Sequence, residues 1–394
     1  MYSALLAAGA GVASAVQATC TTDIVITSPT PTIECDVVDA NIRVDPAVNG
    51  DLVIEGPKQI KGDLIIANAT SLISISSNSI NSIQGTFSMI NLELLSSLNL
   101  ASLNSLSGLT LTKLPQLSSL SFSPSGITKA NDILIQDTFL SNLDGLNIVE
   151  VDSFVVTNNR KLTKIDSGLT NITSLLAVNN NGPQMSITMS RLQSAAEIQL
   201  SNIQTFVVPV LGRVLDSLKF DQNPDLKIFT ADNLTTIGES MTFINNKMLT
   251  NVSFPVLTRV GDFTIQNNTA LEILNGYPKL ETITGGAIVG GSFKEVELPQ
   301  LKDVKGGMTV TSTTDIADFC QFFDDLKSHG AIQGSEKCTS NNAKANEGGE
   351  GGTTGHGSSG SGNSTSGSSA VGSSASQMAL VLGLTVLAGI AQLL

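Results

Sequence analysis

Apolar residues recur along this chain at a longer interval than one helix or strand would produce. In the Ser- and Asn-rich segment 68–87, neither the alternation of a strand nor the three- and four-residue spacing of a helix fits. Leu64 and Ile66 match Phe87 and Met89 at an offset of 23 residues. The same offset carries Leu72, Ile75, Ile80 and Ile83 onto Leu95, Leu98, Leu103 and Leu106. A period of about 22–24 residues indicates a solenoid.

One pair of apolar residues two apart marks a short strand in each later period, with one face turned inward. These pairs are Leu109/Leu111, Ile133/Ile135, Phe154/Val156, Leu176/Val178, Ile198/Leu200, Leu218/Phe220, Met241/Phe243, Phe263/Ile265, the weaker Ala287/Val289, and Met308/Val310. Apolar residues three apart follow, such as Leu162 and Ile165, and indicate the less regular sides of a coil. The pattern predicts an all-β solenoid of about twelve coils over residues 19–338.

Asparagine recurs two residues beyond many of the strand pairs. The positions are Asn68, Asn91, Asn158, Asn180, Asn202, Asn245 and Asn267. At the corner of a coil, stacked amides can bond the backbone groups that the turn leaves unpaired. We therefore expect an inward-facing structural ladder of asparagines rather than a ligand site.

Both ends of such a stack expose apolar surface unless they are capped. At the C-terminal end, residues 315–330 predict a helix with Asp315 as its N-cap and Gly330 at its end. One face of that helix would carry Phe319, Phe322, Phe323 and Leu326. At the N-terminal end, the segment between the first two cysteines is the expected cap.

Four cysteines, Cys20, Cys35, Cys320 and Cys338, allow three disulfide pairings. An elongated solenoid keeps its two ends apart, so it allows only Cys20–Cys35 and Cys320–Cys338. Each bond would close a short loop and contribute about 3 kcal/mol. Zinc is a weaker explanation, because the spacings do not fit a zinc motif and the two histidines lie in the helix end (His329) and a Gly/Ser tract (His356).

Composition changes the picture of the surface more than that of the core. Hydrophobic residues make up 41% of the chain but charged residues only 14%, so Ser, Thr and Asn must cover the outside. The net charge is −13 and there is no Lys/Arg-rich run, which argues against nucleic acid as a partner.

The N-terminus has the features of a secretory signal. Residues 1–18 are largely apolar and end in Val16-Gln17-Ala18, the small-x-small form that signal peptidase cleaves, so we expect cleavage after Ala18. An ordinary first helix is the alternative.

The C-terminus has the features of a glycosylphosphatidylinositol (GPI) attachment signal. Residues 378–394 are apolar, and a run of small and polar residues precedes them. The expected attachment residue is Gly367, with Ser368 and Asn363 as alternatives. Residues 339–367 would then be a Ser/Gly-rich flexible stalk, and 368–394 a propeptide that is removed. A single tail-anchored membrane span is the other interpretation.

Six N-x-S/T sequons occur, at Asn68, Asn171, Asn233, Asn251, Asn267 and Asn363. Asn171, Asn233 and Asn251 each precede an inward apolar residue, so their side chains should face solvent and carry N-glycans. Asn68 and Asn267 fall in the expected ladder, where an inward amide could not carry a sugar, so both interpretations stay open there.

A polysaccharide lyase or hydrolase on a parallel β-helix is the main enzymatic alternative. Glycoside hydrolysis needs two carboxylates across a groove, and the candidate pairs are Asp221/Asp225 and Asp324/Asp325. The first pair flanks a turn and the second lies on the cap helix, so solvated charges are the simpler interpretation. Sugar grooves also favour aromatic platforms, for which only Tyr2 and Tyr277 stand out. We therefore expect no enzyme, and assign no catalytic residue, metal ligand, small-molecule substrate or cofactor.

Arg160, Lys161 and Lys164 form the most distinctive charged cluster on a coil. They are either a partner-binding patch or part of a solvated outer side.

The chain as a whole resembles the fungal GPI-anchored cell-wall organisation proteins, the group that includes extracellular-matrix-mutant and sporulation-specific wall proteins. The likeness lies in "GDLIIANATSLISI", "GTFSMINLELLSSLNLASLNSL", "DFTIQNNTALEIL" and "FKEVELPQLKDVKGGMTV", in the cysteine pair at each end and in the Ser-rich tail. The repeats are similar to receptor L domains, which implies a right-handed β-helix related to leucine-rich repeats.

The resemblance implies a non-enzymatic glycoprotein of the plasma membrane or wall that supports wall organisation and integrity. Its expected partners are the GPI lipid and wall glucan or other wall proteins, and the Ser/Thr-rich stalk would be O-mannosylated. A ligand-binding ectodomain or adhesin is the second hypothesis, and a wall-polysaccharide-remodelling enzyme is the third.

Overall fold

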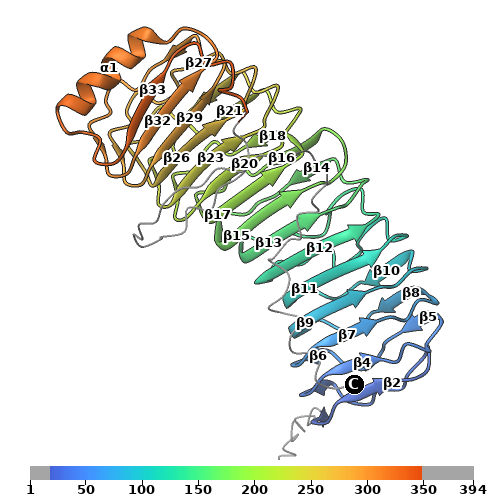
Figure 1. Cartoon of the computed structure of the whole chain (residues 1–394). Helices are drawn as coiled ribbons and strands as arrows, with labels where there is room; N and C mark the ends of the chain where they lie inside the picture. The colour runs from blue at the N-terminus through green and yellow to red at the C-terminus, as the bar shows by residue number, and fades with distance from the viewer. Residues whose placement is uncertain (1–17, 348–394) are drawn as a thin grey trace, which may run out of the picture. The chain divides into compact units, whose positions relative to one another are not determined.

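The computed structural model describes residues 18–347, which form a β-solenoid of about 13 turns, close to the number predicted. Figure 1 shows the main strands of successive coils lying side by side, and neighbouring coils pair in parallel. The expected signal residues 1–17 and everything from residue 348 lie outside the described residues. This places His356, Asn363, Gly367, Ser368 and the propeptide 368–394 outside them too.

The main strands pair consecutively along the whole stack and belong to one 23-stranded sheet. In order of pairing they are β2 (Ile24–Ile26), β4 (Ile42–Val44), β7 (Leu64–Ala67), β9 (Ser82–Ile90), β11 (Ser105–Leu114), β12 (Asp132–Thr138), β13 (Glu150–Thr157), β15 (Asn171–Asn179), β17 (Ser194–Ser201), β20 (Leu218–Asp221), β23 (Ser240–Ile244), β26 (Asp262–Gln266), β29 (Ala287–Gly291), β32 (Met308–Ser312) and β33 (Glu336–Thr339).

Short strands on the neighbouring side of the coils join the same sheet. They are β1 (Thr19–Cys20), β3 (Val37–Val38), β6 (Gln59–Ile60), β19 (Arg213–Val214), β22 (Thr236–Ile237), β25 (Arg259–Val260), β28 (Thr282–Ile283) and β31 (Asp303–Val304). The remaining strands form four small sheets: β5 (Gly50–Val53), β8 (Leu72–Ser77) and β10 (Ser97–Leu100); β14 (Lys164–Asp166), β16 (Met185–Thr188) and β18 (Ile203–Val207); β21 (Ile228–Thr230) and β24 (Asn251–Ser253); β27 (Ile273–Leu274) and β30 (Glu295–Val296).

Strand register confirms the repeat found in the sequence. Leu64 pairs with Phe87 and Ile66 with Met89, at the predicted offset. All four of these side chains are fully buried. The inward residues therefore stack coil upon coil into one continuous core, which no single coil could enclose alone.

Each end of the stack carries a disulfide, as predicted. Cys20 bonds Cys35 and Cys320 bonds Cys338, with Cα–Cα distances of 5.8 and 5.6 Å. The helix α1 (Ala317–Ser328) covers the C-terminal end and buries Phe319 and Phe323. Its N-cap position is Ile316 rather than the predicted Asp315.

Candidate functional site

In five coils an asparagine side chain follows the main strand one residue beyond the predicted position, and these side chains form a ladder that Ile203 interrupts in the coil of β17. The members of this ladder are Asn159, Asn181, Asn223, Asn246 and Asn268. The Nδ2 of Asn246 donates to the Phe220 carbonyl at 3.1 Å. Its Oδ1 accepts from the backbone N–H of Asn223 at 3.0 Å and from Asn223 Nδ2 at 2.8 Å. Each amide therefore satisfies backbone groups of the corner that no strand pairs.

The seven asparagines expected in this ladder line the outer side of the corner instead. Their φ angles are all positive, between 53° and 61°. Asparagine tolerates this left-handed conformation better than most residues. Several of them bond along the surface: Asn91 Nδ2 donates to Asn68 Oδ1 at 3.0 Å, and Asn267 Nδ2 to Asn245 Oδ1 at 2.6 Å. The prediction of an inward ladder at these positions was wrong, because the left-handed residue faces outward and the residue after it faces the core.

Three of the five described sequons present an amide nitrogen without a hydrogen-bond partner within residues 18–347. Asn68 and Asn251 are exposed, and Asn171 is half-buried. Asn171 uses only its oxygen, which accepts from Ser194 Oγ at 2.6 Å, and Asn68 likewise accepts through Oδ1. A glycan attaches through the amide nitrogen, and at these three positions that nitrogen is not engaged by other described residues.

The other two described sequons use that nitrogen in the fold. Asn233 Nδ2 donates to the Pro209 carbonyl at 2.6 Å, and Asn267 Nδ2 donates to Asn245 Oδ1. A glycan at either residue would have to break or bend that bond.

The carboxylate pairs nominated for glycoside hydrolysis have different environments. Asp221 lies 3.6 Å from Lys219 Nζ and accepts from Asn245 Nδ2, whereas Asp225 has no such contact within residues 18–347. Asp324 and Asp325 are exposed on α1. Of the two hollows found in the described part of the chain, neither is lined by both members of either pair.

The basic cluster divides into three separate environments. Lys164 pairs with Asp166 at 3.4 Å, with both side chains more than 60% exposed. Lys161 Nζ lies 5.2 Å from the centre of the Phe139 ring, in a cation–π contact. Arg160 has no hydrogen-bond or ion-pair partner in the described part of the chain. The sequence analysis missed Phe139. Within residues 18–347 it is the one aromatic residue that is exposed, while the others are buried or half-buried.

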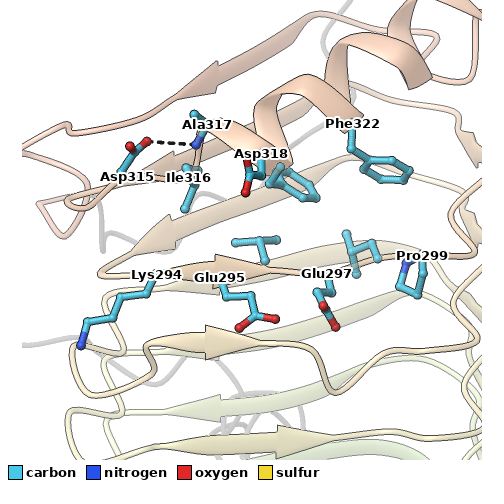
Figure 2. A pocket seen from close by; sticks show the side chains of 12 residues that line it. Lys294, Glu295, Glu297, Pro299, Asp315, Ile316, Ala317, Asp318 and Phe322 are labelled. Atoms are coloured by element: carbon cyan, nitrogen blue, oxygen red, sulfur yellow. Dashed lines mark hydrogen bonds between the residues drawn. The ribbon is translucent and has the colours of Figure 1, made fainter.

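A hollow of about 660 Å³ lies between α1 and the turn that carries β30. Figure 2 shows Asp318 and Phe322 on the helix side and Glu295 and Glu297 on the strand side. The hydrogen bond with Glu297 and the negative charge of Glu297 raise the pKa of Glu295. Both glutamates lie on the strand side of the hollow rather than across it from each other, which is not the arrangement of a carboxylate pair that glycoside hydrolysis needs.

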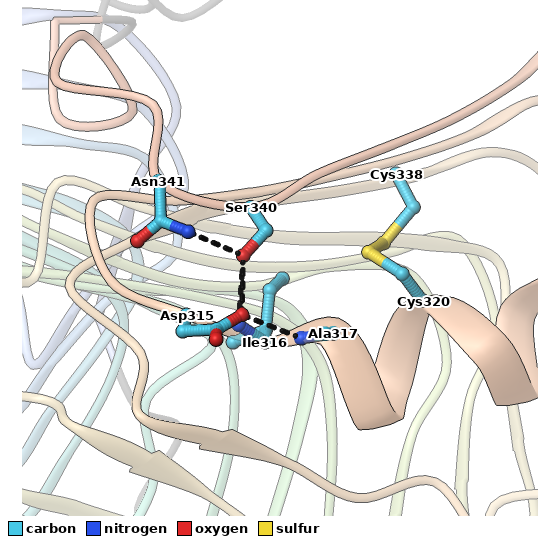
Figure 3. Close-up of a disulfide and its surroundings, with 7 residues drawn as sticks. All are labelled: Asp315, Ile316, Ala317, Cys320, Cys338, Ser340 and Asn341. Carbon is cyan, nitrogen blue, oxygen red and sulfur yellow. Dashed lines mark hydrogen bonds between the residues drawn. A yellow bond between two sulfur atoms is a disulfide. The ribbon is translucent and has the colours of Figure 1, made fainter.

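Polar contacts beside the disulfide hold the cap helix against the stack. Asp315 Oδ1 accepts from Ser340 Oγ at 2.8 Å and from the Ala317 N–H at 3.0 Å, as Figure 3 shows. These bonds lower the pKa of Asp315. Lys327 and Glu336 form an ion pair at 2.8 Å between α1 and β33. The arrangement is that of a structural cap.

Within residues 18–347 no cluster of three or more His, Cys, Asp or Glu side chains that could hold a metal ion occurs. In the same range no helix has the length and apolar character needed to cross a membrane.

Comparison with known proteins finds relatives along most of the chain. It is 32% identical over 326 residues to "Protein ecm33" of Aspergillus fumigatus, covering 82% of this chain and 81% of the relative. It is 34% identical over 316 residues to "Cell surface GPI-anchored protein" of Arthroderma benhamiae, covering 80% of each. "Cell wall mannoprotein PST1" of Saccharomyces cerevisiae is 32% identical, with 79% of this chain and 69% of the relative covered.

No family model matches the chain. No solved structure matches it either.

Proposed function

Because this chain belongs to the family of fungal cell-surface and cell-wall proteins that includes protein ecm33, we propose that it is a GPI-anchored surface glycoprotein supporting the organisation and integrity of the cell wall. The observation that carries the proposal is the 34% identity, over 80% of both chains, to a relative named as a cell surface GPI-anchored protein. The role proposed is structural, without catalysis.

The solenoid suits a role outside the cell. Its continuous core is closed at both ends, and disulfides of the kind found at each cap persist in oxidising compartments. With only 14% charged residues, its surface presents mainly hydroxyl and amide groups. Such a surface can hydrogen-bond to neutral wall polymers such as glucan, or to other wall proteins, which are the partners proposed.

We propose the following processing. Residues 1–18 are removed as a signal peptide. Residues 339–347, which were expected in the stalk, instead pack against the last coils, where the N–H groups of Asn341 and Asn342 donate to the carbonyls of Thr314 and Ser312, so the proposed stalk is 348–367. The lipid is attached at Gly367, or at Ser368 or Asn363, and residues 368–394 are discarded. N-glycans are proposed first at Asn68, Asn171 and Asn251, whose amide nitrogens lack a partner among the described residues, and then at Asn233, Asn267 and Asn363.

Cell fractionation tests the anchor. The full chain is expected in the membrane or wall fraction, and phosphatidylinositol-specific phospholipase C or glucanase should release it where high salt does not. A matched chain that lacks residues 378–394 should lose the attachment signal and appear in the medium. Retention of the full chain after both enzymes, or release by salt alone, would contradict the proposal.

Peptide mapping after enzymatic deglycosylation tests the sugar sites. Occupancy is expected at Asn68, Asn171 and Asn251. Unmodified peptides at all three positions would show that accessibility of the amide nitrogen does not select the sites.

A further inference from the structure

The corner between β17 and β18 is much shorter than the corners of the neighbouring coils. The hollow that it leaves is called the notch below. Six residues (158–163) connect β13 to β14, and six (222–227) connect β20 to β21. Five residues (180–184) connect β15 to β16. Between β17 and β18 there is one residue, Asn202. The coil of β17 therefore lacks most of the corner that its neighbours have on either side.

The space left by this short corner is a hollow of about 440 Å³, within the range of ~300–1,000 Å³ common for small-molecule sites. Asn202 belongs to the short connection. The neighbouring corners supply the other lining residues: Arg160, Asn180, Asn181, Gly182, Pro183, Gln184, Pro224 and Asp225. These residues come from four successive coils, so the stacking of the solenoid alone brings them together.

Most polar groups of the notch are not used by the fold. Within residues 18–347 the side chains of Arg160, Gln184 and Asp225 have no hydrogen-bond or ion-pair partner. Asn202 Nδ2 donates to Asn180 Oδ1, which leaves the nitrogen of Asn180 and the oxygen of Asn202 unbonded. The notch therefore presents donors and acceptors together.

The backbone of the notch is also less regular than that of the other corners. The corner 180–184 holds two residues with left-handed φ, Asn180 at 53° and Gln184 at 55°. The neighbouring corners also have a left-handed residue at the position of Asn180, and asparagine tolerates it, so Gln184 is the additional one, at a cost of about 1–2 kcal/mol. Strain of this kind is concentrated at ligand-binding sites more often than elsewhere.

The chemistry of the lining selects a neutral, hydroxyl-rich ligand. An amide offers both a donor and an acceptor, as a sugar hydroxyl does. One guanidinium opposite one carboxylate gives the notch no net charge, so neither an anion nor a divalent cation is favoured. The exposed ring of Phe139 lies on the same corner one coil before Arg160, since Thr138 bonds Asn159 at 2.6 Å. That ring could stack on a further sugar unit.

We propose that this notch binds an oligosaccharide segment of a neutral wall polysaccharide through Arg160, Asn180, Gln184, Asn202 and Asp225. This inference deepens the proposed function, on which it rests for the presence of such a polymer around the protein. The notch provides the specific contact, and the rest of the solenoid provides the rigid support.

The test is saccharide binding by the secreted chain ended at residue 350, which keeps both disulfides and the whole compact unit. The probes are hexamers of β-1,3-glucan, chitin and mannan, titrated by calorimetry and by ligand-observed nuclear magnetic resonance. At least one hexamer is expected to bind. Arg160→Ala and Asp225→Ala should each weaken it by about tenfold, as expected for loss of one hydrogen bond to a charged group.

Two control variants make an alanine and a glycine substitution in a corner of ordinary length, away from the notch. Lys247→Ala follows a ladder asparagine as Arg160 does, and Asn245→Gly matches Asn202→Gly in backbone position. Both controls should bind normally, whereas Asn202→Gly should bind more weakly. No binding of any hexamer, or equal losses in notch and control variants, would overturn the proposal. The release of the full chain by phospholipase or glucanase does not depend on the result of this titration. The anchor and the notch are therefore tested separately.

Discussion

The corner after the main strand is filled in two ways in the two halves of the solenoid. In the N-terminal coils a left-handed residue (Asn68, Asn91 or Lys113) is followed by a buried aliphatic residue. The aliphatic residues are Ala69, Leu92 and Leu114. In most of the later coils the equivalent left-handed residue is followed by an asparagine of the ladder, and the exception is the coil of β17, where Ile203 follows Asn202. The backbone bend is thus common to both halves, whereas the group that fills the corner is not.

The two halves also differ in the core beside that corner. Seven aromatic rings between Phe206 and Tyr277 contact one another with centre separations of 4.6–6.2 Å. The coils that carry Leu92 and Leu114 are packed mainly with leucine and isoleucine. This solenoid therefore keeps its register with either an apolar corner or a hydrogen-bonded one.

The largest effect is expected from breaking the ladder at its centre. Asn246→Leu leaves the N–H of Asn223 and the carbonyl of Phe220 buried without these partners. We expect the free energy of unfolding to fall by about 3–5 kcal/mol, because each unpaired buried group costs roughly 1–3 kcal/mol. Urea denaturation measures it. A loss below about 1 kcal/mol would mean that the ladder amides are not needed.

The reverse exchange should cost somewhat less. Leu92→Asn places an amide between Ala69 and Leu114, where no stacked asparagine can bond it. The expected loss is about 2–4 kcal/mol, from the buried amide and the lost apolar contact. Urea denaturation measures this loss. Wild-type stability in the variant would show that the two kinds of corner are interchangeable, against the difference described between the two halves.

The left-handed residue should respond alike in both halves. Asn91→Ala and Asn245→Ala are each expected to lower the free energy of unfolding by about 1–2 kcal/mol, because alanine pays the steric cost of positive φ. Asn91→Gly and Asn245→Gly avoid that cost and serve as matched controls. An alanine variant more stable than its glycine counterpart would argue against the left-handed backbone.

The smallest effect concerns the hydroxyl of Tyr277. It is buried without a hydrogen-bond partner within residues 18–347. Tyr277→Phe should therefore raise the free energy of unfolding by about 1 kcal/mol. Differential scanning calorimetry against wild type measures this change, and a lower melting temperature in the variant would contradict it.

The same hydroxyl predicts a difference at high pH. Burial raises the pKa of Tyr277 well above its ordinary value of 10.0. The unfolded chain then releases this proton above pH 10 while the folded protein retains it, so the wild type loses stability as the pH rises. Tyr277→Phe should lose less over the same range. Equal losses in both proteins would show that the hydroxyl ionises in the folded state.

The repeat, the coil register and both caps could be predicted from the sequence, because stacked coils force inward residues to recur at one interval. The offset of Leu64 and Phe87 already gave their pairing. The ladder was misplaced by one residue, because the prediction took the asparagine two residues after the strand pair. In an Asn-Asn pair such as Asn245-Asn246, that residue is the first of the two. The sequence did hold a signal for the correct position. The second asparagine of each pair is aligned with the apolar residues Ala69 and Leu92 of other coils, which marks it as the buried one.

The notch was only partly visible in the sequence. The strand pairs Ile198/Leu200 and Leu218/Phe220 are only 20 residues apart, whereas the next interval, from Leu218 to Met241, is 23, which indicates a shortened coil. Arg160 and Asp225 are far apart in sequence, and they line one hollow only because four coils stack. Phe139 was missed because the exposure of its ring depends on which side chain of the next coil lies beside it, here Lys161.

Hydrogen–deuterium exchange of the intact ectodomain tests the central comparison most directly. The N–H groups of Asn223 and Asn246 donate to buried amide oxygens at 3.0 and 2.9 Å, whereas that of Leu92 donates to the Lys113 carbonyl at 3.3 Å. We predict exchange at least about tenfold slower at Asn223 and Asn246 than at Leu92. Equal or faster exchange at the two asparagines would contradict the claim that side-chain amides secure the C-terminal corners.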